Sequence, residues 1–124
     1  SATCGFAQAV RSGIDANFIN AASSFGEAIK SVSTSQIRNI FGSIKKMEME
    51  ADFDFARFLM LKPRVAYARK REGKKEFGAL ADEITRAIDA VSEEKDETKR
   101  QERFRRFCQG FEAILAYHRA AGGK

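Results

Sequence analysis

The sequence predicts an all-α fold, a compact single-domain bundle of about five or six helices, and three observations support this prediction. Apolar residues recur at helical spacing in several separate stretches. No window shows the strict alternation of apolar and polar residues that is typical of half-buried strands. The chain has 124 residues, one proline and no internal repeat or linker that would divide it, so its length fits one domain.

Residues 1–32 give the weakest helical pattern. An amphipathic helix is allowed by the spacing of Val10, Ile14, Phe18, Phe25 and Ile29. Glycines and serines interrupt this stretch and lower its helix propensity. We therefore expect residues 1–32 to form a variable helical segment that packs on a core of residues 33–124.

The next segment carries both a start signal and an apolar stripe. Ser33 and Gln36 have the spacing of a capping box, with Ser33 at the N-cap position. The stripe that follows consists of Ile37, Ile40, Phe41, Ile44 and Met47. Together these features predict a helix over residues 34–49.

Two shorter helices are expected before residue 74. Asp52 or Asp54 is suited to cap a short helix that ends near Leu61. Pro63 fits the first turn of another helix, and the residue before a proline is disfavoured in helical conformation, so Lys62 should lie outside it. Gly73 is placed to end this helix.

Two longer helices complete the bundle, over about residues 75–92 and 96–120. The first is predicted by Phe77, Leu80, Ala81, Ile84, Ile88 and Val91, and the second by Phe104, Phe107, Cys108, Phe111, Leu115 and His118. Eleven phenylalanines against two tyrosines indicate a core rich in phenylalanine.

Positive charge is concentrated in part of the chain. The net charge is +5, but residues 51–75 hold eight basic and three acidic residues, whereas residues 76–100 hold four and eight. Arg38 and Lys45 share a helix face because they are seven residues apart, Lys46 lies close to it, and Gly42 between them would let another backbone approach. Such a face fits phosphate binding, and a solvated helix face is the alternative interpretation.

The sequence argues against an enzyme, a cofactor and a membrane span. Cys4 and Cys108 are too few and too far apart for a disulfide framework or a zinc site, and they fit free thiols in a reducing cytoplasm. His118, the single histidine, continues an apolar stripe near a helix end, which favours a structural role. The acidic cluster around Asp52 and Asp54 lacks the pattern of a calcium loop, and no apolar stretch approaches the ~20 residues of a membrane span.

Three segments are distinctive in their order and spacing. They are residues 34–39 (TSQIRN), residues 61–68 (LKPRVAYA) and residues 111–118 (FEAILAYH). Over roughly residues 33–121 they resemble the small subunit of type III-A CRISPR effector complexes, the Csm type. The first 32 residues carry no motif of this resemblance.

The resemblance implies an all-helical, non-catalytic protein. Members of that family associate head to tail into a filament, which lies beside other subunits and lines the groove that holds the guide–target RNA duplex. Because base pairing supplies sequence specificity in such complexes, the small subunit is expected to contact the RNA backbone. No metal and no catalytic residue is expected.

Six basic residues inside or beside the matching segments are the candidate RNA-binding residues: Arg38, Lys45, Lys46, Lys62, Arg64 and Arg69. Each has a structural alternative, as an ion-pair partner or a solvated charge. Two other functions remain open at this point. One is a helical protein–protein scaffold without a nucleic-acid role, and the other is a metal-dependent phosphodiesterase that uses Asp52 and Asp54.

Overall fold

The computed structural model describes residues 2–123, and these residues form seven helices and no strand. The helices are α1 (Phe6–Ser12), α2 (Ala16–Ala28), α3 (Thr34–Glu48), α4 (Phe55–Leu59), α5 (Leu61–Glu72), α6 (Lys75–Ser92) and α7 (Glu97–Ala120). Met60 alone separates α4 from α5, so the pair amounts to one interrupted helix. The all-α single-domain prediction is confirmed.

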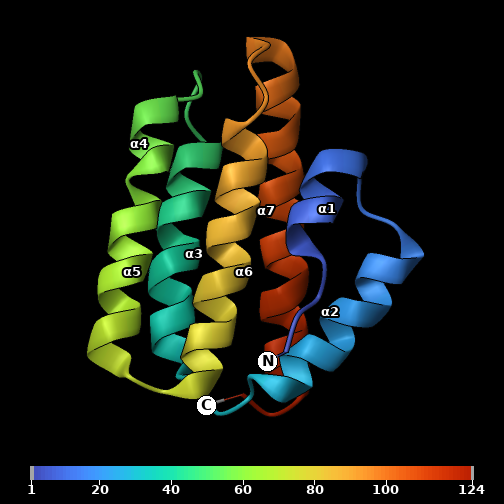
Figure 1. Cartoon of the computed structure of the whole chain (residues 1–124), viewed down its shortest axis with the longest axis vertical. Coiled ribbons are helices and arrows are strands. Elements are labelled where there is room, and N and C mark those ends of the chain that lie inside the picture. The colour runs from blue at the N-terminus through green and yellow to red at the C-terminus, as the bar shows by residue number, and fades with distance from the viewer. Residues whose placement is uncertain (1, 124) are drawn as a thin grey trace.

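The longest helices run side by side along the long axis of the molecule (Figure 1). Helix α7 packs against α1, α2, α3 and α6. Helix α5 packs against α6. The two N-terminal helices lie together at one flank (Figure 1), where Phe6, Phe18 and Phe25 are each 5 % exposed or less. The variable character expected of residues 1–32 stays a prediction.

Phenylalanine rings fill the space between these helices. The rings of Phe6 and Phe107 stack with centroids 5.2 Å apart, and Phe58 meets Phe107 edge-on at 5.1 Å. Phe53 and Phe104 stack at 4.5 Å. Each aromatic pair adds about 0.5–1.5 kcal/mol to the free energy gained from burial, so this cluster joins α1, α4 and α7 into one core.

Several helix ends follow the predicted signals. Asp54 caps α4 through the N–H of Arg57 at 3.0 Å. Asp96, which was predicted as the start of the last helix, lies just before α7 and caps it through the N–H of Lys99 at 2.9 Å. Gly73 ends α5 with a φ of +70°, which only glycine adopts without strain. Helix α6 covers the predicted range of 75–92.

Two local predictions were wrong. Ser33 precedes α3 but its side chain does not cap the helix, and the Gln36 amide instead donates a 2.6 Å hydrogen bond to Glu72 of α5. Lys62 is helical, because α5 begins at Leu61 and places Pro63 within the first turn. The first-turn N–H groups need no intrahelical acceptor, so proline is tolerated there.

The N-terminal stretch is two helices rather than one. Gly13 has a φ of +112°, a conformation that side-chain-bearing residues rarely adopt, and this turn separates α1 from α2. Asp15 then caps α2 by accepting a 2.8 Å hydrogen bond from the N–H of Phe18.

Candidate nucleic-acid interface

The outer face of α3 holds three of the six candidate residues. Burial of Ile37, Ile44 and Met47 orients α3 and leaves Arg38, Lys45 and Lys46 exposed on its solvent side. We call these three residues the α3 outer face. Arg38 lies two helical turns before Lys45 and Lys46, at the seven-residue spacing that the sequence predicted.

The cations of the α3 outer face differ in their partners. Lys45 donates a 3.1 Å hydrogen bond to Glu48, which raises the pKa of Lys45, and its ammonium lies 5.6 Å from the centroid of the Phe41 ring. Within residues 2–123, Arg38 and Lys46 form no ion pair. Two of the three charges are therefore available to an anionic partner.

Two other candidates, Lys62 and Arg69, lie on the side of α5 that faces α6, and both have carboxylate partners there. The Lys62 ammonium lies 2.7 Å from Asp89 Oδ1, and Arg69 pairs with Asp82. The seven-residue spacing on α5 matches the seven-residue spacing of the two aspartates on α6, so the pairs form a ladder between the helices. A phosphate would have to compete with these aspartates for Lys62 and Arg69.

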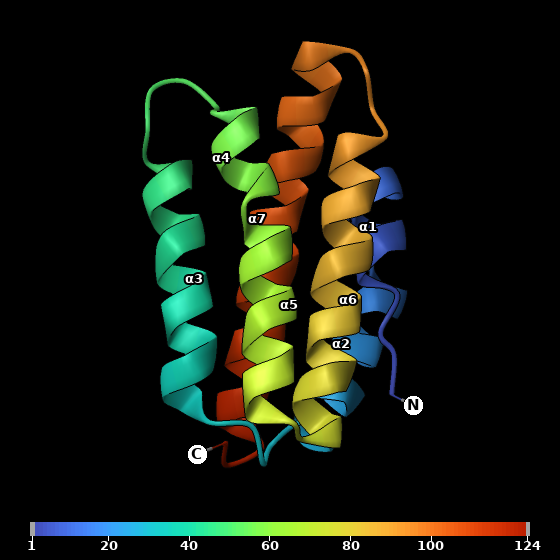
Figure 2. The ribbon, with the colours of Figure 1, turned by 60° about the vertical axis from the view of Figure 1, so that its left-hand side comes forward.

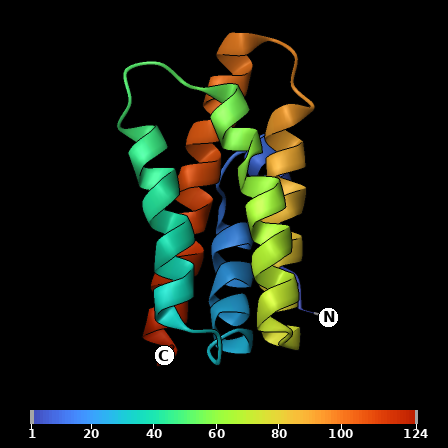
Figure 3. The same cartoon turned by 90° about the vertical axis from the view of Figure 1, so that its left-hand side faces the viewer.

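Arg64, the sixth candidate, lies in a groove between α3 and α5. Figures 2 and 3 both show these helices running alongside each other, and the hollow between them has a volume of about 500 Å³. Arg64 donates a 3.2 Å hydrogen bond to the Ser43 hydroxyl across it. Gln36 and Tyr67 also line this groove, so two of the distinctive sequence segments meet here.

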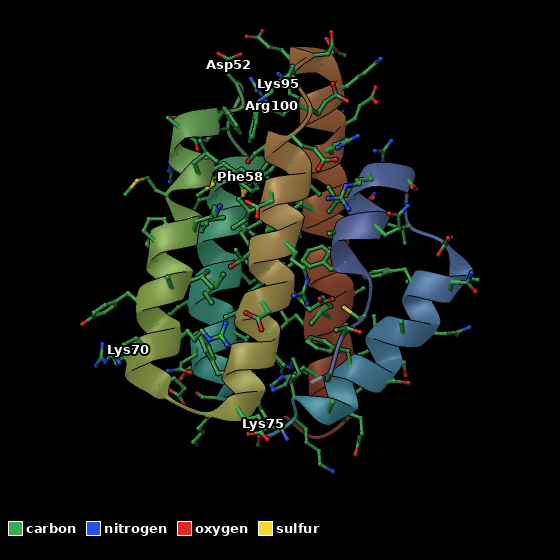
Figure 4. All side chains as sticks on the ribbon, viewed as in Figure 1. Asp52, Phe58, Lys70, Lys75, Lys95 and Arg100 are labelled. Carbon is green, nitrogen blue, oxygen red and sulfur yellow. The ribbon has the colours of Figure 1, made fainter. Side chains whose placement is uncertain are left out.

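The structure thus distributes the six candidates over three surfaces and does not bring them into one site. It also reveals a basic end of the bundle whose three lysines were not among the candidates. Lys70, Lys74 and Lys75, with Arg69, line a hollow of about 610 Å³ where α5 turns into α6. Figure 4 shows Lys70 and Lys75 at this end of the bundle. The local charge excess of residues 51–75 was the signal in the sequence for this surface.

The single histidine and the two cysteines are buried inside the bundle. His118 is fully buried, and its Nε2 donates a 2.8 Å hydrogen bond to the carbonyl of Val32. Both cysteines are buried and unpaired with each other. Burial, with the nearby Glu48 carboxylate, raises the pKa of the Cys108 thiol to about 12. Its thiolate is therefore scarce at neutral pH.

Between residues 2 and 123, no group of three or more His, Cys, Asp or Glu side chains is placed to hold a metal ion. In the same range, none of the helices combines the length and the apolar character needed to cross a bilayer.

These features define a class: a small, single-domain, all-helical protein whose basic residues lie on separate outer surfaces over a phenylalanine-rich core. A family model described as Csm2 Type III-A matches residues 15–124. The chain therefore belongs to that family and is a small subunit of a type III-A CRISPR complex. Comparisons with curated proteins and with solved structures found no match. The family match includes α2, which the sequence motifs had left out.

Proposed function

We propose that this chain is a non-catalytic small subunit that contacts RNA backbone without sequence specificity. In this proposal it works in the cytoplasm, associates head to tail with further copies, and lines the groove that holds the guide–target RNA duplex beside other subunits of the complex. Family membership carries the proposal. The exposed cations supply its physical basis.

The α3 outer face is the favoured RNA-contacting surface. Exposed cations on one helix face attract phosphates regardless of base sequence. Arg38 and Lys46 can bind a phosphate without breaking an ion pair. Lys62 and Arg69 would first have to separate from their aspartate partners. Contacts of this kind are few in each subunit, and repetition along a filament would multiply their effect through avidity.

The salt dependence of RNA binding tests this proposal. For single-stranded RNA, log affinity falls with log salt with a slope of about −0.7 for each phosphate contacted. We expect the triple variant Arg38→Ala/Lys45→Ala/Lys46→Ala to make that slope shallower by about 2 for two 20-nucleotide RNAs of unrelated sequence. Fluorescence anisotropy between about 50 and 300 mM salt measures it.

A second triple variant separates a surface from net charge. Lys95→Ala/Lys99→Ala/Arg105→Ala removes the same number of exposed cations elsewhere, and we expect it to leave the slope within about 0.7 of the wild-type value. Equal changes in both triple variants would contradict an RNA site on α3. If the wild-type chain, in isolation and in its complex, bound no RNA at low salt, the protein–protein scaffold would become the better interpretation.

A further inference from the structure

The groove between α3 and α5 has an apolar floor. Leu61, Val65 and Phe77 lie beneath this floor and are each only 1 % exposed. The apolar surface that stays open comes from the partly exposed Ile40 and Ala68 and from the exposed Tyr67. In Figures 2 and 3, no other helix lies in front of the neighbouring helices α3 and α5. The groove therefore offers apolar surface to an occupant from outside the chain.

The lip of the groove alternates apolar and cationic side chains. Met60, Arg64, Tyr67 and Arg71 follow one another at spacings of four, three and four residues, which places them on one face of α5. Met60 is 57 % exposed and Tyr67 is 68 % exposed, although large apolar side chains are usually buried. At 1.5 Å per residue, this face is about 16 Å long.

The charge at the lip is not balanced. Within residues 2–123, neither Arg64 nor Arg71 forms an ion pair, and Arg64 donates only to the neutral Ser43 hydroxyl. These two guanidinium groups are seven residues apart on the same helix face. Carboxylates at a matching spacing would complement both.

The lining favours protein over RNA. An RNA backbone gains little from covering Ile40, Met60 and Tyr67, because its surface is charged and well hydrated. An amphipathic helix gains from both parts of the surface, with its apolar stripe on the floor and its carboxylates on the lip.

We propose that the groove between α3 and α5 is the docking site for an amphipathic α-helix of another protein subunit. The docked helix carries an apolar stripe that covers Ile40, Tyr67 and Ala68. It is flanked by Asp or Glu side chains about two turns apart that pair with Arg64 and Arg71. This inference goes beyond the proposed RNA contacts and does not rest on them, because it concerns a different face of α3 and different cations.

Photo-crosslinking from the groove tests the inference in the native complex. Tyr67→p-benzoylphenylalanine keeps an aromatic side chain at an exposed position and reacts with whatever covers the lip. We expect irradiation of the purified complex to join it to a helical protein segment that has an apolar stripe and paired acidic residues. Mass spectrometry of the crosslinked peptides identifies the segment.

A charge reversal and a second crosslinking position make the result specific. Arg64→Glu/Arg71→Glu should lower the yield of that crosslink at least tenfold. A synthetic peptide of the mapped segment should bind the purified chain, and a version with lysines in place of its acidic residues should bind the reversed chain better. Gln109→p-benzoylphenylalanine, on the exposed side of α7, should not capture the segment.

The other outcomes each overturn the inference. A crosslink from Tyr67 to RNA would make the groove a nucleic-acid site, and a crosslink to a second copy of this chain would make it a self-association surface. No crosslink, or one to a segment without acidic residues that persists in the charge-reversed variant, would show that no acidic helix docks here. The salt-slope measurement on the α3 outer face is independent of all of these outcomes.

Discussion

Glu83 is a buried carboxylate, 2 % exposed, that ties the N-terminal residues to α6. It accepts hydrogen bonds from the N–H of Cys4 at 2.9 Å and the N–H of Phe6 at 3.4 Å, and the Cys4 thiol donates at 3.0 Å. Arg86, one turn further along α6, pairs with it. Glu83 therefore does for the start of α1 what an N-cap residue does, because it accepts hydrogen bonds from backbone N–H groups there. It lies far from α1 in the sequence.

We expect Glu83→Gln to lower the free energy of unfolding by about 1.5–3 kcal/mol at neutral pH. The amide keeps one acceptor oxygen but turns an N–H₂ group toward donors and removes the charge that Arg86 neutralises. Urea denaturation measures the loss. Glu102→Gln, at an exposed position of α7, is the control and should change stability by less than about 0.5 kcal/mol.

The same variant has a defined pH dependence. Burial raises the pKa of Glu83, but hydrogen bonds from Cys4, Arg86 and the backbone outweigh it and hold the pKa below the ordinary value of 4.5. The stabilisation is therefore complete above pH 4.5 and is lost as pH falls through the lowered pKa. The difference between wild type and Glu83→Gln should shrink below pH 4.5, and a constant difference down to pH 3 would contradict this account.

The exposure of some side chains could be predicted from the sequence, whereas the partners of others could not. The exposed positions of Arg38, Lys45 and Lys46 follow from helical period alone, and that information is local. The pairing of Lys62 with Asp89 joins residues 27 positions apart and depends on how α5 packs on α6. Nothing near Lys62 in the sequence indicates that partner.

At the scale of whole helices, capping residues and helix-breaking glycines predicted several of the residues at which helices begin or end. Asp54 and Gly73 act through atoms within a few residues, so α4 begins and α5 ends as predicted. The Ser33 capping box did not form, because Gln36 bonds to Glu72 on another helix. A tertiary contact of this kind competes with a local one and is not visible in the local pattern.

The packing of α2 on α7 depends on a glycine. A methyl group at Gly26 would lie 2.6 Å from the carbonyl carbon of Tyr117 and 2.8 Å from the backbone nitrogen of His118. Backbone atoms cannot move aside without shifting a helix. We expect Gly26→Ala to lower the free energy of unfolding by about 1–3 kcal/mol, although alanine is the better helix former.

Gly42 provides the matched comparison within α3. It is exposed, and a methyl group there would meet no atom within 4 Å. Gly42→Ala should therefore raise the free energy of unfolding by up to about 1 kcal/mol. Thermal or urea denaturation of both variants tests the contrast, and equal effects at the two glycines would show that close helix packing does not decide the result.

The molecule as a whole is electrically polar along its length. One end holds residues 49–57 and 93–100, in which seven acidic residues outnumber four basic ones, whereas residues 69–76 at the other end hold five basic and two acidic residues. The other end holds the turn between α5 and α6 with Lys70, Lys74 and Lys75. Figure 4 shows Asp52 and the pair Lys70 and Lys75 at opposite ends of the bundle.

Opposite charges at opposite ends give a physical basis for the proposed head-to-tail association. A copy that approaches end to end meets attraction, whereas two like ends repel. We expect weak association of the wild-type chain at about 50 mM salt that disappears at about 500 mM, where the Debye length is only a few ångströms. Sedimentation velocity over a range of concentrations measures it.

Charge reversal at each end then distinguishes head-to-tail contact from other modes. Lys70→Glu/Lys75→Glu gives a chain with two acidic ends, and Asp52→Lys/Glu97→Lys gives a chain whose acidic end is made basic. Neither should associate alone, because each presents like charges at both ends. An equimolar mixture should associate again, because the reversed end of each variant complements the other. Association of either variant alone at the wild-type level, or a mixture that stays monomeric, would mean that the two charged ends do not form the contact.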